Sequence, residues 1–340
     1  MGSGTTIGEA HKLGMTTLGR DINPVACESI RVALSPINRN QLLSTFQHLS
    51  STTGHQIRKL YQTIDENGDP GVVLYYFWVK QINCLHCASE IDLFSSYIFA
   101  QHAYPKKKPE VQVYCPTCGD IFQALYHQEQ VTCHHCQTRF NPRKGTANGA
   151  KATCNTCGHV SPIIQSIQTT NSPPKHKLYA KLVLADQGIK KYLPAVEPDY
   201  QAYAACEQRL KSDEIEGLIQ LPNTTLFKGH NTRQAMRYNY YTWRDFFNAR
   251  QLLALGWLHE SIINLSEGAE RDALFTLFSG TLEFNNLFAS YKGEGTGAVR
   301  HMFSHHTLKP ERTPIEANIW GTAKVLALFL VFFAAGYYVP

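Results

Sequence analysis

The sequence lacks the features that would direct it into or across a membrane. Its first residues contain neither a basic segment nor an apolar one, so we predict no signal peptide. The uncharged run at 325–339 has 15 residues, whereas a membrane-spanning helix needs roughly 20. We therefore expect a cytoplasmic protein. Its 340 residues allow two or three domains at about 100–200 residues each.

The chain also has little excess charge of either sign. Its 32 lysines and arginines exceed its 27 aspartates and glutamates by only five, which is weak evidence for a nucleic-acid partner. Clusters of basic residues are better evidence, although a run of lysines is usually only a solvated surface. The clusters contain Lys106, Lys107, Lys108, Arg139, Arg143, Lys144, Lys175, Lys177 and Lys181.

Cysteine, in contrast, follows a clear pattern. The ten cysteines include four CxxC pairs, and in a reducing compartment such pairs indicate metal binding rather than disulfides. Two residues between cysteines let both sulfurs of one turn reach one ion, and two such turns complete a tetrahedron around Zn²⁺. We predict two structural zinc sites made from Cys84, Cys87, Cys115, Cys118, Cys133, Cys136, Cys154 and Cys157.

Two ways of joining these turns are open. The middle pairs, CPTCG and CHHC, are separated by fourteen residues, a spacing typical of a zinc ribbon. If the middle pairs share one ion, the first and last pairs share the other, and the sites are nested. The alternative joins consecutive pairs. We favour the nested arrangement, and in either case we expect closed sites that stabilise the fold and do not catalyse a reaction.

Hydrophobic spacing and turn residues predict an α/β protein. Apolar residues at helical spacing predict helices at 5–13, 25–34, 41–64 with a break near 50–54, 200–210, 246–263 and 269–288. Runs of β-branched and aromatic residues predict strands at 72–79 and 178–185, and a further strand is expected at 15–20. Residues 166–177 and 292–314 are expected to be mostly loop.

The first residues, Gly2-Ser3-Gly4, suggest a cofactor-binding turn. Glycine allows close backbone approach, and the N–H groups at the start of the helix that follows can meet an anion or a carboxylate. Asp21 lies 17 residues after Gly4 at the end of the predicted strand, where an acid can bind ribose hydroxyls. This layout is half of a Rossmann unit for an adenosine-containing cofactor, without the strand before the glycines. The alternative is a flexible Gly- and Ser-rich start.

The stretches MGSGTTIGEAHKLG and GRDINPVA resemble motif I and the acidic strand end of S-adenosylmethionine-dependent DNA methyltransferases of the amino-group type, which modify adenine N6 or cytosine N4. By this resemblance, Gly2, Ser3 and Gly4 contact the methionine and adenosine parts, Asp21 binds the ribose, and Asn23 belongs to the turn that follows. The segments 228–257 and 297–321 resemble a subgroup with a zinc-ribbon insertion. The resemblance covers residues 1–322.

The resemblance implies a partial Rossmann-like fold with an inserted double zinc ribbon and a mainly helical C-terminal region. It implies S-adenosylmethionine and two Zn²⁺ ions as cofactors. It also implies double-stranded DNA as a partner, and restriction or defence-system proteins as further partners. The expected divisions are a cofactor-binding half at 1–36, a helical spacer at 37–71, the zinc-ribbon insertion at 72–165, a helical DNA-facing region at 178–322 and an apolar tail at 323–340.

The catalytic motif of that family is missing. Methyl transfer to a base amine needs Asp, Asn or Ser followed by Pro-Pro and an aromatic ring that stacks on the flipped base. The one Pro-Pro of this chain, Pro173-Pro174, precedes Lys175 and is expected to lie in an ordinary loop. The Asp-Pro-Phe that precedes the glycines in the family is also absent. We therefore predict no catalytic residue and expect a fragment truncated at both ends and inactive on its own.

The expected activity of the complete enzyme is methylation of an exocyclic amine, with adenine N6 as the preferred target. The alternative is a non-catalytic, zinc-ribbon DNA-binding protein. For the tail at 323–340, the alternatives are a frame-shifted end, a buried element and a membrane anchor.

A dense group of arginines and aromatics in the helical region suits a nucleic-acid groove, although part of it is expected to face a core. Its members are Arg233, Arg237, Tyr238, Tyr240, Tyr241, Trp243, Arg244 and Arg250.

Overall fold

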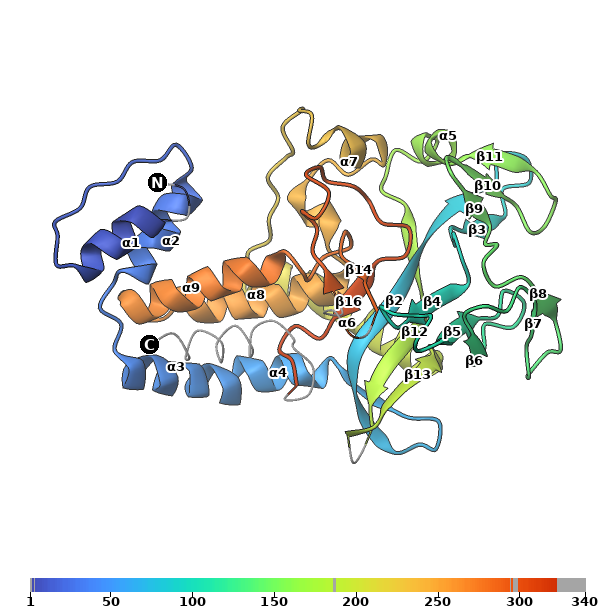
Figure 1. The fold of residues 1–340 in the computed structure, drawn as a ribbon, viewed down its shortest axis with the longest axis horizontal. Coiled ribbons are helices and arrows are strands. Elements are labelled where there is room, and N and C mark those ends of the chain that lie inside the picture. Colours follow the sequence, from blue (N-terminus) through green and yellow to red (C-terminus); the bar gives the residue numbers. More distant parts are fainter. Residues whose placement is uncertain (1, 3, 186–187, 294, 296–298, 323–340) are drawn as a thin grey trace.

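The computed structural model describes residues 2, 4–185, 188–293, 295 and 299–322 (Figure 1). The helices are α1 (Thr5–Lys12), α2 (Pro24–Ala33), α3 (Arg39–Ser51), α4 (Thr53–Lys59), α5 (Ile163–Gln168), α6 (Glu197–Ile215), α7 (Arg233–Arg237), the 3₁₀ turn η2 (Trp243–Phe246), α8 (Ala249–Ile263) and α9 (Ala269–Leu282). The central strands are β1 (Gln62–Ile64), β2 (Pro70–Asn83), β3 (Glu90–Asp92), β12 (Lys175–Leu184), β13 (Lys190–Pro194) and β16 (Ile315–Ala317). The shorter strands are β4 (Ile98–Gln101), β5 (Glu110–Tyr114), β6 (Ile121–Leu125), β7 (Val131–Thr132), β8 (Arg139–Phe140), β9 (Ala147–Asn148), β10 (Lys151–Thr153), β11 (Val160–Pro162), β14 (Ser290–Tyr291) and β15 (Val299–Arg300).

Strand β2 is the centre of the largest sheet. It pairs with β1, β3, β12 and β16, while β13 pairs with β12, and all of these pairs are antiparallel. Its sequence VVLYYFWV is rich in the β-branched and aromatic residues that favour strands. Since these residues are buried on both faces of β2, the strand needs cover on both sides.

The two faces of β2 enter two different cores, because successive side chains of a strand point to opposite faces. Tyr75, Phe77 and Val79 belong to the core shared with the small cysteine-bearing sheets. Tyr76 and Trp78 belong to the core shared with the helices. In Figure 1 the helices α3, α4, α8 and α9 accordingly lie on one side of the central sheet and the small sheets on the other.

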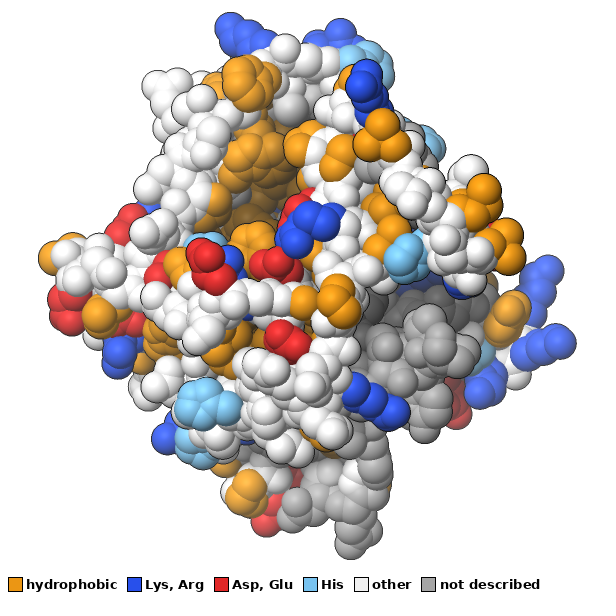
Figure 2. Space-filling model, turned by 90° about the vertical axis from the view of Figure 1, so that its left-hand side faces the viewer, with side chains coloured by type: hydrophobic (Ala, Val, Ile, Leu, Met, Phe, Trp, Pro, Cys, Tyr) orange, Lys and Arg blue, Asp and Glu red, His pale blue; other side chains and the backbone are white. Residues whose placement is uncertain are grey.

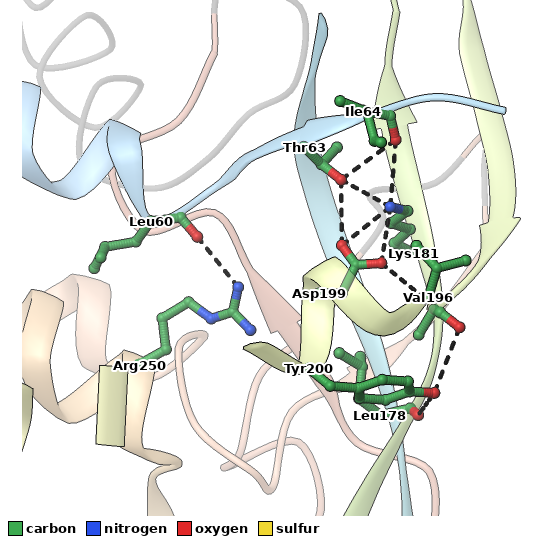
Figure 3. Close-up of polar contacts among 10 residues, drawn as sticks. Leu60, Thr63, Ile64, Leu178, Lys181, Val196, Asp199, Tyr200 and Arg250 are labelled. Carbon is green, nitrogen blue, oxygen red and sulfur yellow. Dashed lines mark hydrogen bonds and ion pairs between the residues drawn. The ribbon is translucent and has the colours of Figure 1, made fainter. Parts of the chain in front are cut away.

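Buried ion pairs attach the helices to this sheet. Lys181 of β12 lies 2.8 Å from the Asp199 carboxylate of α6, and both side chains are almost fully buried (Figure 3). Arg250 of α8 pairs with Glu316 of β16 at 3.0 Å and donates to the carbonyl of Leu60 at 3.1 Å. A charge at these depths is tolerated only with a partner, so each pair fixes where its helix meets the sheet.

Most expected elements are confirmed. The first two helices, the helices α6, α8 and α9, and the strands β2 and β12 lie where they were predicted, with ends that differ by a few residues. Residues 41–64 contain α3 and α4 with the expected break, but they end in β1 rather than in helix.

The strand predicted at 15–20 is wrong, because these residues have no regular structure. Among the described residues no strand pairs with them, and a strand needs the hydrogen bonds of a partner strand. The side chains of Met15 and Leu18 are 59% and 88% exposed, so no core covers them either.

The central sheet joins β2, from the segment expected to be a zinc-ribbon insertion, to β12, β13 and β16, from the linker and the helical region. The fold is therefore mixed α/β, with several antiparallel sheets among the described residues. None of the helices within the described ranges is both long and apolar enough to cross a membrane. The apolar tail at 323–340 lies outside the described residues.

Candidate metal centres and cofactor turn

Four cysteines at the ends of β2 and β10 form the outer centre, namely Cys84, Cys87, Cys154 and Cys157. The Sγ atoms of Cys84 and Cys157 are 3.7 Å apart, as are those of Cys87 and Cys154. Each CxxC turn connects two antiparallel strands, β2 to β3 and β10 to β11. The turns bring together residues about 70 positions apart in the sequence.

The inner centre contains the middle pairs, Cys115, Cys118, Cys133 and Cys136. Sγ of Cys115 lies 3.6 Å from Sγ of Cys136, and Sγ of Cys118 lies 3.6 Å from Sγ of Cys133. These turns connect β5 to β6 and β7 to β8. The structure thus groups the cysteines in the nested arrangement, and the sequential pairs are not brought together.

All four turns have the same backbone geometry. In each, the N–H of the residue after the second cysteine donates to the carbonyl of the first, at 2.9–3.0 Å. That residue has a positive φ in every turn, which glycine adopts without strain. Glycine occupies this position at Gly119 and Gly158, whereas Ala88 and Gln137 occupy it in the other two turns.

The sulfur positions fit a tetrahedral metal ion. With Zn–S bonds of about 2.3 Å, the edge of a sulfur tetrahedron is about 3.8 Å, close to the distances in both centres. The cysteine pKa values shift in both directions within each centre, and those of Cys118 and Cys157 are raised to about 12. The neighbouring hydroxyl of Ser89 lowers the pKa of Cys87 to about 6, and that of Thr138 lowers the pKa of Cys136 to about 6. Either centre can therefore hold a metal ion.

The acid of the predicted cofactor turn, Asp21, forms hydrogen bonds with backbone groups of the turn itself. The Asp21 carboxylate accepts the N–H groups of Gly2 and Asn23, each at 2.9 Å. These bonds, that from Asn23 first, hold the pKa of Asp21 well below its usual range. The Asn23 side chain accepts the N–H of Val25 and caps α2. Ser3 lies outside the described residues.

Gly4 fits its position for two reasons. Its φ is +81° at the N-terminus of α1, and a Cβ there would come within 2.5 Å of the Ile30 side chain of α2. A larger residue would therefore be strained and would push the two helices apart. Asp21 thus connects Gly2, before α1, to Asn23, at the N-terminus of α2, while Gly4 packs against Ile30. That these residues bind a cofactor stays a prediction.

Some of the basic and aromatic residues expected to contact nucleic acid are exposed, and others are buried. Arg143 is exposed, and its guanidinium stacks 4.2 Å from the ring centre of Tyr126. In contrast, Lys181, Tyr240 and Arg250 are buried, so their expected contact with phosphates or bases is wrong. The reason is that the two cations neutralise buried carboxylates and the tyrosine packs against Phe246 and Phe288.

The Pro173-Pro174 segment is an ordinary loop, as predicted. The side-chain amide of Asn239 donates to the carbonyls of Ile167 and Ser172 and so anchors the loop to the helical region. Lys175 then begins β12.

Sequence reasoning missed the buried polar contacts and a cavity between α8 and α9. The partner of Arg250 is 66 positions away at Glu316, and no local pattern connects them. The cavity, of about 580 Å³, has a detectable signal, because its α8 residues recur at the spacing of one helix face: Leu252, Leu255, Gly256 and His259.

No protein-family model matches this chain, and comparison with curated proteins and with solved structures gives no match either.

Proposed function

We propose that this chain is a zinc-binding protein of the DNA amino-methyltransferase type. In this proposal, two Zn²⁺ ions stabilise the cysteine-bearing module, and the turn at Gly2–Asp21 binds S-adenosylmethionine. The observation that carries the proposal is the coexistence of two nested Cys₄ groups with a glycine turn whose backbone and acid converge at the start of a helix.

Zinc fits the metal centres best. Four thiolates at tetrahedral spacing suit Zn²⁺, while magnesium and calcium prefer oxygen ligands. Both sites use all four positions for protein sulfur, which leaves no open position for a substrate. Zinc would therefore hold the turns in place and take no part in chemistry.

Asp21 would act as the ribose-binding acid. Its low pKa keeps it ionised at neutral pH, and an ionised carboxylate accepts hydrogen bonds from ribose hydroxyls. The N–H groups that surround it and the N-terminus of α1 give the turn a positive electrostatic potential, which suits the carboxylate of the methionine part. Since residues 15–20 form no strand, this part of the proposal depends on the glycine turn and Asp21 and not on a Rossmann-like sheet within residues 1–36.

Double-stranded DNA is the proposed partner, and Arg143 stacked on Tyr126 is its best candidate contact on the module. Since Pro173-Pro174 lies in an anchored loop, we assign no catalytic residue to this chain. A non-catalytic DNA-binding protein that lacks cofactor affinity is the second candidate, because the Cys₄ centres and Arg143 do not depend on the glycine turn.

Calorimetry with the zinc-loaded protein tests the cofactor site. We expect S-adenosylmethionine to bind, and Asp21→Asn to weaken binding about tenfold or more, because a hydrogen bond to a charged group contributes about 1.5–3 kcal/mol. Asp69→Asn is the matched control, since Asp69 is an exposed aspartate in another turn. Absence of binding by the wild-type protein would overturn the cofactor assignment.

DNA binding separates the two candidates. Titration of a labelled duplex at several salt concentrations should show affinity that falls with salt and weakens in Arg143→Ala. DNA binding without S-adenosylmethionine binding would favour the non-catalytic candidate. If neither ligand binds, both candidates fail and only the metal centres remain.

A further inference from the structure

A hollow lined by hydrophobic side chains opens on the face shown in Figure 2. Its floor consists of one face of α8 and one face of α9, which pack side by side. The α9 residues on the floor are Phe278, Ser279 and Leu282, and Glu283 follows at the C-terminus of the helix.

Three loop segments and one residue of α2, Val25, complete the walls. The loop segments are 220–222, the η2 turn with Phe247, and Met302 with Phe303. Gly256 lets the first segment close against α8, because a Cβ there would lie 3.2 Å from the side chain of Ile219. Trp243 and Phe303 remain 36% and 48% exposed, so aromatic surface faces solvent at the opening.

The size and lining suit a small organic molecule. Ligand pockets usually measure about 300–1,000 Å³ and are mostly apolar with a few polar groups, and this cavity of about 580 Å³ falls within that range. It shares no residue with the metal centres, and it adjoins the predicted cofactor turn at Val25, whose N–H donates to the Asn23 side chain.

The charge of the lining points to a cation. Among the described residues that line the cavity, Glu283 is the carboxylate, His259 is an imidazole, and none is lysine or arginine. Glu283 also caps the C-terminus of α9, where the helix dipole adds negative potential. Aromatic faces such as those of Trp243 and Phe303 attract cations as well.

We propose that this cavity binds an aromatic organic cation, with the ring among the aromatic and aliphatic side chains and the ammonium group at Glu283. The apolar walls account for the ring, and the carboxylate with the helix C-terminus accounts for the charge. His301 lies beside Glu283, with its Nδ1 3.6 Å from the carboxylate. The ammonium group would occupy the open side of the carboxylate, whose side chain is 43% exposed.

Three probes that differ mainly in charge test the proposal by calorimetry at neutral pH. They are tryptamine, a cation; tryptophol, its neutral alcohol analogue; and indole-3-acetate, an anion. We expect tryptamine to bind about fivefold more tightly than tryptophol, and indole-3-acetate to bind most weakly, because one charge pair and one cation–π contact separate the probes.

Two variants and one control complete the test. Glu283→Gln should reduce the preference for tryptamine over tryptophol to the part that the aromatic faces and the helix C-terminus supply, whereas Phe303→Ala should weaken all three probes. Glu267→Gln is the control, since that side chain is 89% exposed and does not line the cavity. The proposal is overturned if tryptamine does not bind, if the probes bind equally to the wild-type protein, or if Glu283→Gln keeps the full preference for tryptamine.

Discussion

The outer and inner metal centres consist of the same parts but hold different lengths of chain. Their sulfur distances are 3.7 and 3.6 Å, and their turns share one backbone geometry. The outer centre joins residues 67 and 73 positions apart, whereas the inner centre joins residues 15 and 21 positions apart. Identical ligand sets can therefore have different structural roles. The outer set connects distant parts of the chain, whereas the inner set holds a local pair of hairpins.

Their surroundings differ in the same way. The outer centre lies at the end of β2, and its cysteines pack with Ile82, Ile91 and Leu93 beside the central sheet. The inner centre lies at the end of the β5–β6 hairpin, which packs in the core that β2 shares with the small cysteine-bearing sheets. From the difference in span, closing the outer loop costs roughly 1 kcal/mol more conformational entropy than closing the inner one.

Removal of both metals should have the largest effect. Each structural zinc contributes on the order of 10 kcal/mol of apparent binding energy to folding. A chelator such as EDTA in excess should therefore unfold the module at 84–162 and lower the melting temperature sharply. Calorimetry and circular dichroism measure this. An unchanged melting temperature after verified metal loss would show that neither centre stabilises the fold.

Loss of the outer centre alone should cause the second-largest loss of stability. We expect Cys154→Ser to lose one zinc and to destabilise the protein by several kcal/mol, because β10 and β11 then separate from the end of β2. Denaturant unfolding measures the change. If Cys154→Ser destabilises the protein no more than the matching inner-centre variant Cys133→Ser does, the two centres contribute equally to the fold and the comparison fails.

Loss of the inner centre should destabilise the protein less, and the effect should be confined to the strands around that centre. Cys133→Ser should lose one zinc, and hydrogen exchange should increase in β5 to β8 while the amides of β2 and β12 stay protected. Exchange that increases throughout the central sheet would mean that the two centres act as one unit, which contradicts the comparison.

The smallest expected change in stability comes from replacing the non-glycine residue with positive φ in one turn of each centre, and it should be the same in both centres. Ala88 in the outer centre and Gln137 in the inner centre have φ of 60° and 58°, so glycine at either position should relieve a similar strain. We expect Ala88→Gly and Gln137→Gly each to stabilise the protein by about 0.5–1 kcal/mol. Thermal denaturation of the two variants measures this, and a clear difference between them would mean that the turns are not equivalent.

The metal centres could be predicted from the sequence because their ligands follow a local rule. CxxC spacing fixes which sulfurs share a turn, and the fourteen residues between the middle pairs favoured the nested arrangement that the structure has. Hydrophobic patterning likewise predicted the positions of α8 and β2. The outer turns pair because the inner turns already share the other site, and the remaining features depend on residues close together in the sequence.

Features that depend on distant residues were not predictable. The pairing of β2 with β12 crosses about 100 residues, and nothing local identifies Glu316 as the partner of Arg250. Arg250 and Lys181 looked like surface cations because their carboxylate partners lie elsewhere in the chain. The strand expected at 15–20 failed for the same reason, since strands form only where another strand lies alongside.

The most direct test of the nested zinc arrangement is the metal content of the double variant Cys84→Ser/Cys154→Ser. Both cysteines belong to the outer centre, so the variant should keep one zinc per chain, against two in the wild-type protein. Mass spectrometry of the intact, native protein counts the ions. Retention of no zinc, with the wild-type protein holding two, would place the two cysteines in different sites and contradict the account.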